Sequence, residues 1–315
     1  MSDTFGGVLG LNRRNWLIAR YNPRFAIHSV NDKFRTKERL AEHGVPVPQT
    51  LALLENREQL TEIDLDRLPE AWAMKPNHGR RGEGILLISG RDESGWKTVS
   101  GMDLSRERII AHASHILDGE HSLDGAHSDS AIVEPLIRTH PVLARIVPYG
   151  LPDVRIICYG PVPLMAMVRL PTNASGGKAN LHQGAIGAAV NFKSGKIFRA
   201  VLHGESIARH PDTGIELVGQ ELPLWDEIVD AASRCASALK LGYVGVDAVL
   251  DEEQGVMVLE CNAHPGIEIQ NINARGLWPR VKAAQRYLDE FGEAPKRYRF
   301  KVRKNLRTRL HNRFE

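Results

Sequence analysis

The stretch at residues 256–266, VMVLECNAHPG, joins an apolar run to two oxygen-bearing side chains and a turn. The run from 256 to 261 predicts a strand, and side chains two residues apart on a strand point to the same face. Glu260 and Asn262 should therefore present a carboxylate and a carboxamide to one point. Hard oxygen donors of this kind suit Mg²⁺, which completes its shell with water and phosphate oxygens.

A second strand is predicted just before this stretch, at residues 243–250 (YVGVDAVL), with a loop at 251–255 between the two. Two such runs with a short loop predict a hairpin. Folding back places Asp247 near Glu260, give or take one register step. Two interpretations of Asp247 stay open: a ligand of a metal–phosphate site with Glu260 and Asn262, or a carboxylate at the sheet rim that pairs with an arginine.

The length and charge of the chain limit its domain organisation and the kind of partner it could bind. A chain of 315 residues exceeds one average domain and suits two lobes that share a cleft. The net charge is +3, but residues 296–315 carry nine Lys and Arg against one acid. This basic tail predicts contact with an anionic partner such as nucleic acid or acidic lipid, or else a solvated terminal helix.

The cysteines and the hydropathy pattern indicate the cellular compartment in which the chain is expected. Cys158, Cys235 and Cys261 are widely spaced, with no CxxC pair, which argues against a zinc site or a disulfide framework and favours a reducing compartment. Cys158 and Cys261 lie in apolar runs and are expected to be buried. No uncharged apolar stretch approaches the roughly 20 residues of a membrane span, and no signal peptide is evident. The sequence predicts a cytoplasmic chain.

The first third of the chain suggests an anion-binding segment. Asn31-Asp32 is an N-cap signal for a helix over 33–42 that stops at Gly44. Lys33 lies in its first turn, where a cation opposes the helix dipole; a phosphate-facing role and ordinary surface placement both remain open. Residues 1–31 predict a short leader that packs through Trp16, Tyr21 and Phe25.

A glycine-rich basic loop at 77–84 joins two predicted strands, 71–76 and 85–88. Glycines let the backbone approach an anion closely, and successive N–H groups can form an anion nest. A flexible hairpin tip is the other interpretation. Lys75 ends the first strand, where its ammonium could reach the same anion.

The middle of the chain supplies further candidates. A helix is predicted over 104–117, and Pro135 within 131–137 predicts an edge strand or a break, where the two lobes connect. Strands 153–159 and 162–170 predict a hairpin with Arg155 and Arg169 on one face, which indicates either a bound anion or local pairing with acids. The polar loop 171–184 is typical of a binding loop, and 225–239 predicts a helix.

Taken in order, these motifs resemble the ATP-grasp superfamily, and within it the RimK-type alpha-L-glutamate ligase-like proteins. The matching motifs run from Asp32-Lys33 to about residue 287 and comprise MKP at 74–76 with the glycine-rich loop, VEPLI at 133–137, DVR at 153–155, Arg169, NLHQG at 180–184, VD at 246–247 and LECNAHPG at 259–266. The resemblance implies an α/β (α+β) ATP-grasp fold, in which two α+β lobes clasp ATP between antiparallel sheets. It divides the chain into a short N-terminal segment (1–32), an N-terminal lobe (33–132), a C-terminal lobe (133–292) and the basic tail (293–315).

The resemblance also implies residue roles. Residues contacting the ATP phosphates would be Lys33, Lys75, Lys178 and Asn180, with the loop glycines Gly79, Gly82 and Gly84 folding over them. The adenine hinge would be Glu134, Pro135 and Ile137, and Asp153 would hold the ribose. Two Mg²⁺ ions, with Mn²⁺ as an alternative, would be bound by Asp247, Glu260 and Asn262. Arg169, with Arg155, would stabilise the transferring phosphoryl group.

The implied activity is an ATP-dependent carboxylate–amine ligase working through an acyl phosphate, such as one adding glutamate to a peptide or protein. Two alternatives stay open: a nucleotide-binding module without turnover that docks through the basic tail, and a small-molecule kinase on the same fold. ATP-grasp ligases usually carry a further domain before the first lysine, whereas only about thirty residues precede Lys33 here. We therefore expect a homo-oligomer or a partner subunit to complete the substrate pocket.

Overall fold

The computed structural model describes residues 7–79, 82–93, 95–122 and 128–291. The chain folds into two compact units. Unit 1 comprises Met1–Val30, Leu40–Pro46 and Thr139–Glu315, and unit 2 comprises Asn31–Arg39 and Val47–Arg138. Among the described helices, none combines the length and the apolar character needed to cross a membrane.

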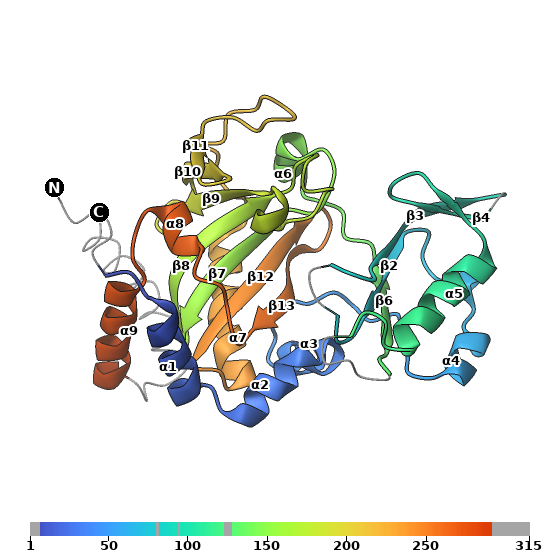
Figure 1. The fold of residues 1–315 in the computed structure, drawn as a ribbon, viewed down its shortest axis with the longest axis horizontal. Helices are drawn as coiled ribbons and strands as arrows, with labels where there is room; N and C mark the ends of the chain where they lie inside the picture. The colour runs from blue at the N-terminus through green and yellow to red at the C-terminus, as the bar shows by residue number, and fades with distance from the viewer. Residues whose placement is uncertain (1–6, 80–81, 94, 123–127, 292–315) are drawn as a thin grey trace. The chain divides into compact units, whose positions relative to one another are not determined.

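Unit 1 is built on a seven-stranded antiparallel sheet with the strand order β11-β10-β9-β8-β7-β12-β13 (Figure 1). Neighbouring strands are mostly joined by short loops, as expected for an antiparallel sheet. The strands are β7 (Asp153–Tyr159), β8 (Val162–Leu170), β9 (Ile186–Val190), β10 (Ile197–Leu202), β11 (Glu205–Ile207), β12 (Tyr243–Asp251) and β13 (Gly255–Asn262).

In the described part of unit 1, four helices pack on the strands of this sheet: α1 (Leu11–Tyr21), α7 (Trp225–Leu239), α8 (Ile269–Asn273) and α9 (Trp278–Phe291). The other helices of unit 1 are α2 (Arg24–Asn31), α6 (Pro141–Ile146) and η2 (Leu181–Gln183). Cys158 on β7 faces α7, since its Sγ lies 3.7 Å from the carbonyl oxygen of Ala232. Ile157 and Tyr159 alternate with Cys158 and point the other way, into a core shared with residues of α1, α8 and α9.

The N-terminal segment packs into unit 1 through aliphatic side chains. Leu9, Leu17 and Ile18 are buried in its core, whereas Trp16 is 50% and Phe25 59% exposed. The prediction of Trp16 and Phe25 as anchors is therefore wrong; the buried stripe of α1 falls on its aliphatic residues. Asn22 fixes the end of α1 to β12, because its side chain donates to and accepts from the backbone of Tyr243 at 2.8 Å each.

Unit 2 is built on a six-stranded antiparallel sheet with the order β1-β6-β2-β3-β4-β5. Its strands are β1 (Ala52–Leu54), β2 (Trp72–Pro76), β3 (Leu86–Asp92), β4 (Gly95–Thr98), β5 (Asp103–Leu104) and β6 (Ala131–Pro135). Its helices are α4 (Arg57–Glu62), η1 (Leu65–Arg67) and α5 (Arg106–Leu117), and α3 (Lys33–Glu42) starts in unit 2 and ends in unit 1. Trp72, Met74 and Ile88 are at the centre of its core.

Strand β6 lies inside the unit 2 sheet, between β1 and β2. The prediction of an edge strand or a break at Pro135 is wrong for a geometric reason. Pro135 pairs with Trp72 of β2, but β1 pairs with β6 only as far as Val133, so no strand faces the missing N–H. The proline thus costs the sheet no ladder hydrogen bond. The unit boundary follows Arg138, which differs from the predicted boundary after residue 132.

The helix predicted over 33–42 is confirmed as α3. Asp32 Oδ1 accepts a hydrogen bond from the backbone N–H of Arg35 at 2.9 Å, which satisfies one of the open donors of the first turn. Gly44 follows with a φ of +67°, the left-handed conformation that glycine adopts at helix ends. The helix predicted over 225–239 and both predicted hairpins of unit 1 are also present.

Candidate functional site

Four charged side chains of β7, β8 and β12 form a ladder on one sheet face of unit 1. In this charged ladder, Arg155 stands opposite Asp247, and Asp153 stands opposite Arg169. Arg155 donates to both carboxylate oxygens of Asp247, at 2.7 and 2.5 Å. Arg169 likewise donates to both oxygens of Asp153, at 2.6 and 2.5 Å, and to Asp247 Oδ2 at 2.9 Å. The two arginines are thus held by local acids, one of the two possibilities left open by the sequence.

The charged ladder is largely withdrawn from water. The side chains of Arg155 and Arg169 are 16% and 13% exposed. Burial works against ionisation of Asp247, but Arg155 and Arg169 prevail and lower its pKa to about 2. Burial raises the pKa of Asp153, which has only Arg169 as a bidentate partner, to about 6. Burial opposes the charge on Arg169, yet Asp153 and Asp247 raise its pKa, and Glu260 adds to that effect.

The raised pKa of Asp153 gives a testable pH dependence. The folded chain holds a proton on Asp153 up to about pH 6, whereas the unfolded chain releases it near 3.8. The contribution of Asp153 to stability therefore falls as the pH rises through this window. From about pH 4 to 7 we expect Asp153→Asn to gain about 3 kcal/mol in unfolding free energy relative to the parent. Urea titrations at several pH values measure this difference, and a constant difference would contradict the assignment.

The predicted metal ligands lie next to the charged ladder. Glu260 on β13 is the register partner of Asp247 on β12, as the hairpin predicted. Its side chain is exposed, whereas Asn262 is half-buried and its Oδ1 accepts a hydrogen bond from the N–H of His264 at 2.7 Å. The oxygens of Glu260 and Asn262 suit Mg²⁺, while both oxygens of Asp247 are already engaged by arginines. In the described parts of the chain, no three His, Cys, Asp or Glu side chains form a metal-binding group.

The turn after Asn262 is held against β12. A Cβ added to Gly245 would lie 2.7 Å from the Cβ of Pro265, closer than side-chain atoms pack. Gly245 therefore lets Pro265 lie directly on the strand, two residues before Asp247. Arg14 of α1 donates to the carbonyl oxygen of Pro265 at 3.4 Å and holds the same turn from outside.

Unit 2 contains a second charged group, the lysine cluster of Lys33, Lys37, Lys75 and Glu134. Glu134 is buried on β6, and its carboxylate pairs with Lys37 of α3 and with Lys75 of β2, the latter at 2.7 Å. Burial lowers the pKa of Lys37 to about 8. Lys33, one turn before Lys37 on α3, donates to the carbonyl oxygens of Asn77 at 3.0 Å and Gly79 at 2.5 Å. Three lysines therefore gather where β2 ends and the glycine-rich loop begins.

The glycine-rich loop is described except for residues 80–81, which lie outside the described residues. Gly82 and Gly84 have φ values of +73° and +70°, which other residues adopt at a cost. The carbonyl oxygen of Gly84 lies 3.0 Å from His112 Nε2 on α5. The loop is thus tied at its start by Lys33 and at its end by His112.

Two predicted phosphate ligands lie in the loop between β8 and β9. Lys178 is exposed, and Asn180 caps η2 by accepting the N–H of His182 at 3.0 Å. Neither has a described hydrogen bond to the charged ladder. The basic tail at 293–315 lies outside the described residues.

Sequence reasoning missed Lys37. The signal for it was its spacing: Lys33 and Lys37 are four residues apart on a predicted helix and so share a face. Its buried partner Glu134 comes from a strand almost a hundred residues later, and no local pattern indicates that pairing.

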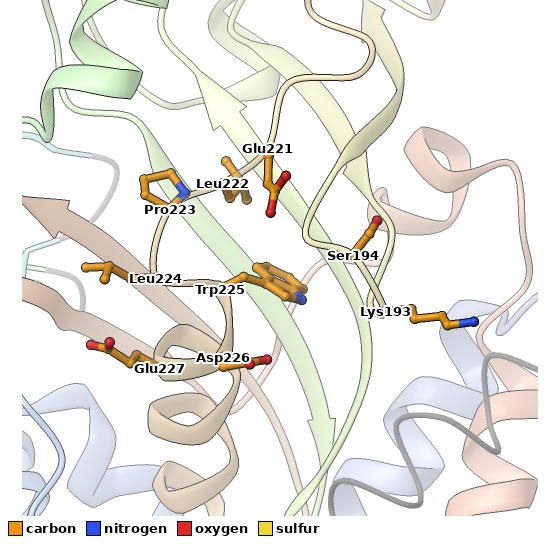
Figure 2. Close-up of a pocket in the computed structure, with 9 residues that line it drawn as sticks. All are labelled: Lys193, Ser194, Glu221, Leu222, Pro223, Leu224, Trp225, Asp226 and Glu227. Carbon is orange, nitrogen blue, oxygen red and sulfur yellow. The ribbon is translucent and has the colours of Figure 1, made fainter.

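A separate hollow of about 470 Å³ lies at the start of α7 (Figure 2). Its lining residues are Lys193, Ser194, Glu221, Leu222, Pro223, Leu224, Trp225, Asp226 and Glu227. Three carboxylates against one ammonium give it a negative field, which disfavours a nucleotide phosphate. We therefore do not assign the nucleotide to this hollow. The charged ladder of unit 1 and the lysine cluster of unit 2 are two separate groups of candidate residues, each described within its own unit.

The family model described as "Sugar-transfer associated ATP-grasp" matches residues 12–286, most of the chain and both charged groups. The chain belongs to this family. The ATP-grasp fold, with its two antiparallel sheets and mixed α/β content, is thereby confirmed. The match confirms the superfamily but not the RimK-type subfamily.

Several solved structures resemble this ATP-grasp chain. The D-cycloserine synthetase DcsG is 14% identical, with a TM-score of 0.47 over 89% of this chain and 80% of that one. The D-alanine–D-alanine ligase from Bacillus anthracis, complexed with ATP, is 16% identical, with a TM-score of 0.44 over 87% and 67%. The ATP-grasp ligase PsnB, complexed with a minimal precursor, is 16% identical, with a TM-score of 0.43 over 84% and 63%. The chain thus spans less than two thirds of PsnB. A search of curated proteins found no match.

Proposed function

We propose that this ATP-grasp chain is an ATP- and Mg²⁺-dependent carboxylate–amine ligase. The observation that carries the proposal is the charged ladder: two half-buried arginines, held by two aspartates, beside the exposed carboxylate of Glu260. Membership of the ATP-grasp family supports ATP as the nucleotide. Arginines that are already fixed in place can stabilise developing negative charge without having to reorganise.

The chemistry explains why arginines are needed. A carboxylate is a poor acyl donor, because its oxygen is a poor leaving group. In the proposed reaction its oxygen attacks the γ-phosphorus of ATP, the bond to ADP breaks, and an acyl phosphate forms. An amine then attacks the carbonyl carbon, inorganic phosphate leaves, and the nitrogen loses a proton to water. Negative charge develops on the phosphoryl oxygens in the first step and on the carbonyl oxygen in the second, and Arg169 and Arg155 would stabilise it.

Other residues of the chain would bind the nucleotide. Lys33 and Lys75 would contact its phosphates, aided by Lys178 and Asn180, and the loop glycines would supply backbone N–H groups. Because the Glu134 carboxylate is engaged by lysines, the adenine hinge would rely on the backbone of Glu134, Pro135 and Ile137. Asp153 would reach the ribose only by sharing its carboxylate with Arg169.

Glu260 and Asn262 would hold a Mg²⁺ ion, since their oxygens lie beside the charged ladder and carry no described contact to a cation. Bound Mg²⁺ supplies charge neutralisation at the phosphates. Asp247 would join them, and a second ion would bind, only if an arginine releases one of its oxygens. Mn²⁺ could replace Mg²⁺ on the same oxygens.

The finer assignment is a RimK-like addition of an amino acid such as glutamate to a peptide or protein. The motifs DVR at 153–155 and NLHQG at 180–184 support it. The same proposal includes a homo-oligomer or a partner subunit that completes the acceptor pocket. It also includes a cytoplasmic location.

ADP release tests the proposal. Purified chain with Mg-ATP and a panel of amino acids and peptides is expected to release ADP. Glu260→Ala should lower the rate of ADP release on the order of 10²–10³-fold, because the Mg²⁺ that neutralises charge in the transition state would lose a ligand. This is the size of effect seen when one stabiliser of transition-state charge is removed. Glu253→Ala, in the β12–β13 loop, should leave the rate unchanged.

Hydroxylamine separates the reaction classes. Formation of a hydroxamate marks an acyl phosphate and supports a ligase, whereas ADP release with a stable phosphate ester and no hydroxamate would identify a kinase. ADP release at background level, equal in the parent and in Glu260→Ala, would overturn the proposal.

A further inference from the structure

The N-terminal helices of unit 1 carry positive charge without any acid. From residue 7 to residue 31 the sequence contains four arginines and no Asp or Glu. Arg13 and Arg20 lie on α1, and Arg24 begins α2. None of these three arginines forms an ion pair with a carboxylate of the described residues. Their charge is therefore available to an external anion.

The same helices expose large apolar side chains. Phe25 is 59% and Leu11 57% exposed, the highest values among large apolar side chains in the described ranges. Trp16 is 50% exposed. Three large exposed apolar side chains on two consecutive helices are more than the scattered single ones that need no explanation.

Two arginines and a tryptophan occupy one side of α1. Arg13, Trp16 and Arg20 are spaced i, i+3 and i+7, so they form a row along the helix, and the buried Leu17 borders this row because it follows Arg13 by four residues. Leu11 precedes the buried Ile18 by seven residues and so lies outside the row. The guanidinium carbon of Arg20 lies 6.0 Å from the ring centroid of Trp16.

Helix α9, shown in red-orange near the blue α1 in Figure 1, extends this arrangement. The guanidinium carbon of Arg13 lies 4.5 Å from the ring centroid of Trp278, and Lys282 Nζ lies 5.5 Å from the same centroid. A second aromatic ring is thus placed beside Arg13 and one further cation, Lys282.

We propose that this N-terminal face, formed by the row of Arg13, Trp16 and Arg20 on α1 with Arg24 and Phe25 of α2, binds the surface of an anionic phospholipid bilayer. Helices that lie in a membrane interface combine basic residues with Trp and Phe, as here. The rings enter the boundary between headgroups and acyl chains, and the guanidinium groups meet the phosphates. The arginines and rings of this face stand on the outside of two helices, which is the arrangement of interfacial helices, whereas single-stranded nucleic acid is typically bound along a positively charged groove. The residues of the proposed ligase reaction take no part in this binding.

Vesicle co-sedimentation tests the proposal with the full-length chain. Vesicles of phosphatidylcholine with about one third phosphatidylglycerol should bind the chain, and the binding should weaken as salt is raised. Arg20→Glu with Arg24→Glu should weaken it at least tenfold, since each basic residue near such a surface contributes about 1 kcal/mol. Trp16→Ser with Phe25→Ser should weaken it by a similar factor.

A matched control comes from unit 2. Met102→Ser with Arg108→Glu removes an exposed apolar side chain and an exposed arginine, and should leave binding unchanged. Trp16→Phe should still sediment with vesicles but should lose fluorescence quenching by lipids brominated in the acyl chain. Circular dichroism verifies that each variant is folded.

Three results would overturn the proposal. The first is equal binding to vesicles with and without phosphatidylglycerol. The second is unchanged binding in both N-terminal double variants, which would assign any lipid binding to the basic tail. The third is binding of single-stranded RNA, in place of vesicles, that depends on the same residues. All three measurements omit ATP, so failure of the ligase assay leaves them unaffected.

Discussion

Replacement of Asp247 by alanine is expected to lower the unfolding free energy by about 3–5 kcal/mol in the absence of metal and nucleotide, the usual cost of breaking a buried ion pair by removing one partner. Arg155 would lose its bidentate carboxylate, and Arg169 would lose one of its two. The side chain of Arg155 is only 16% exposed, so water cannot fully replace the lost partner.

Urea unfolding without Mg²⁺ measures this effect, and two variants serve as controls. Glu260→Ala should leave stability nearly unchanged, because Glu260 is exposed, although it slows ADP release on the order of 10²–10³-fold. Asp289→Ala, at an exposed position of α9, should change little as well. A stable Asp247→Ala variant that fails only with Mg-ATP would show that Asp247 acts as a metal ligand and not as the counter-ion of the arginines.

The sequence predicted those parts of the fold that rest on local signals. The cap at Asp32 and the stop at Gly44 defined α3, and acids in the first turn marked α7. The hairpin of β12 and β13 followed from two apolar runs and a short loop, and this placed Asp247 opposite Glu260. Local patterns carry such information because each depends on residues within a few positions of one another.

The parts that sequence left undecided depend on distant partners. Asp247 could bind a metal or an arginine, and the choice rests on Arg155, which a separate hairpin brings to the neighbouring strand. Pro135 predicted an edge because a proline cannot donate, but the end of β1 leaves that position unpaired. The exposure of Trp16 and Phe25 could not be foreseen either, since composition alone does not show which side of α1 meets the core.

Replacement of Glu134 by alanine is expected to destabilise unit 2 by about 3–5 kcal/mol. Glu134 is the shared counter-ion of Lys37 and Lys75, whose side chains are 5% and 13% exposed. Lys37 would have to remain buried without a partner or give up its proton, and burial already lowers its pKa to about 8 from 10.5. The loss should shrink as the pH rises toward 10.5, because the unfolded chain then releases the same proton.

A double variant separates the ion pair from the volume it fills. Lys37→Met with Glu134→Leu replaces Glu134 and the more buried of its two lysines by apolar groups. This variant should recover most of the stability that Glu134→Ala loses through Lys37, because buried ion pairs are often no more stable than apolar replacements. Hydrogen exchange in peptides of β2 and β6 reports on unit 2 alone and should show faster exchange in Glu134→Ala than in the double variant. Equal exchange in both would mean that Glu134 acts through something other than its pair with Lys37. ATP binding can also be measured, because Lys33 and Lys75 remain in the double variant. If the affinity for ATP falls although stability is restored, the lysine cluster positions the phosphate-binding groups as well as stabilising the fold.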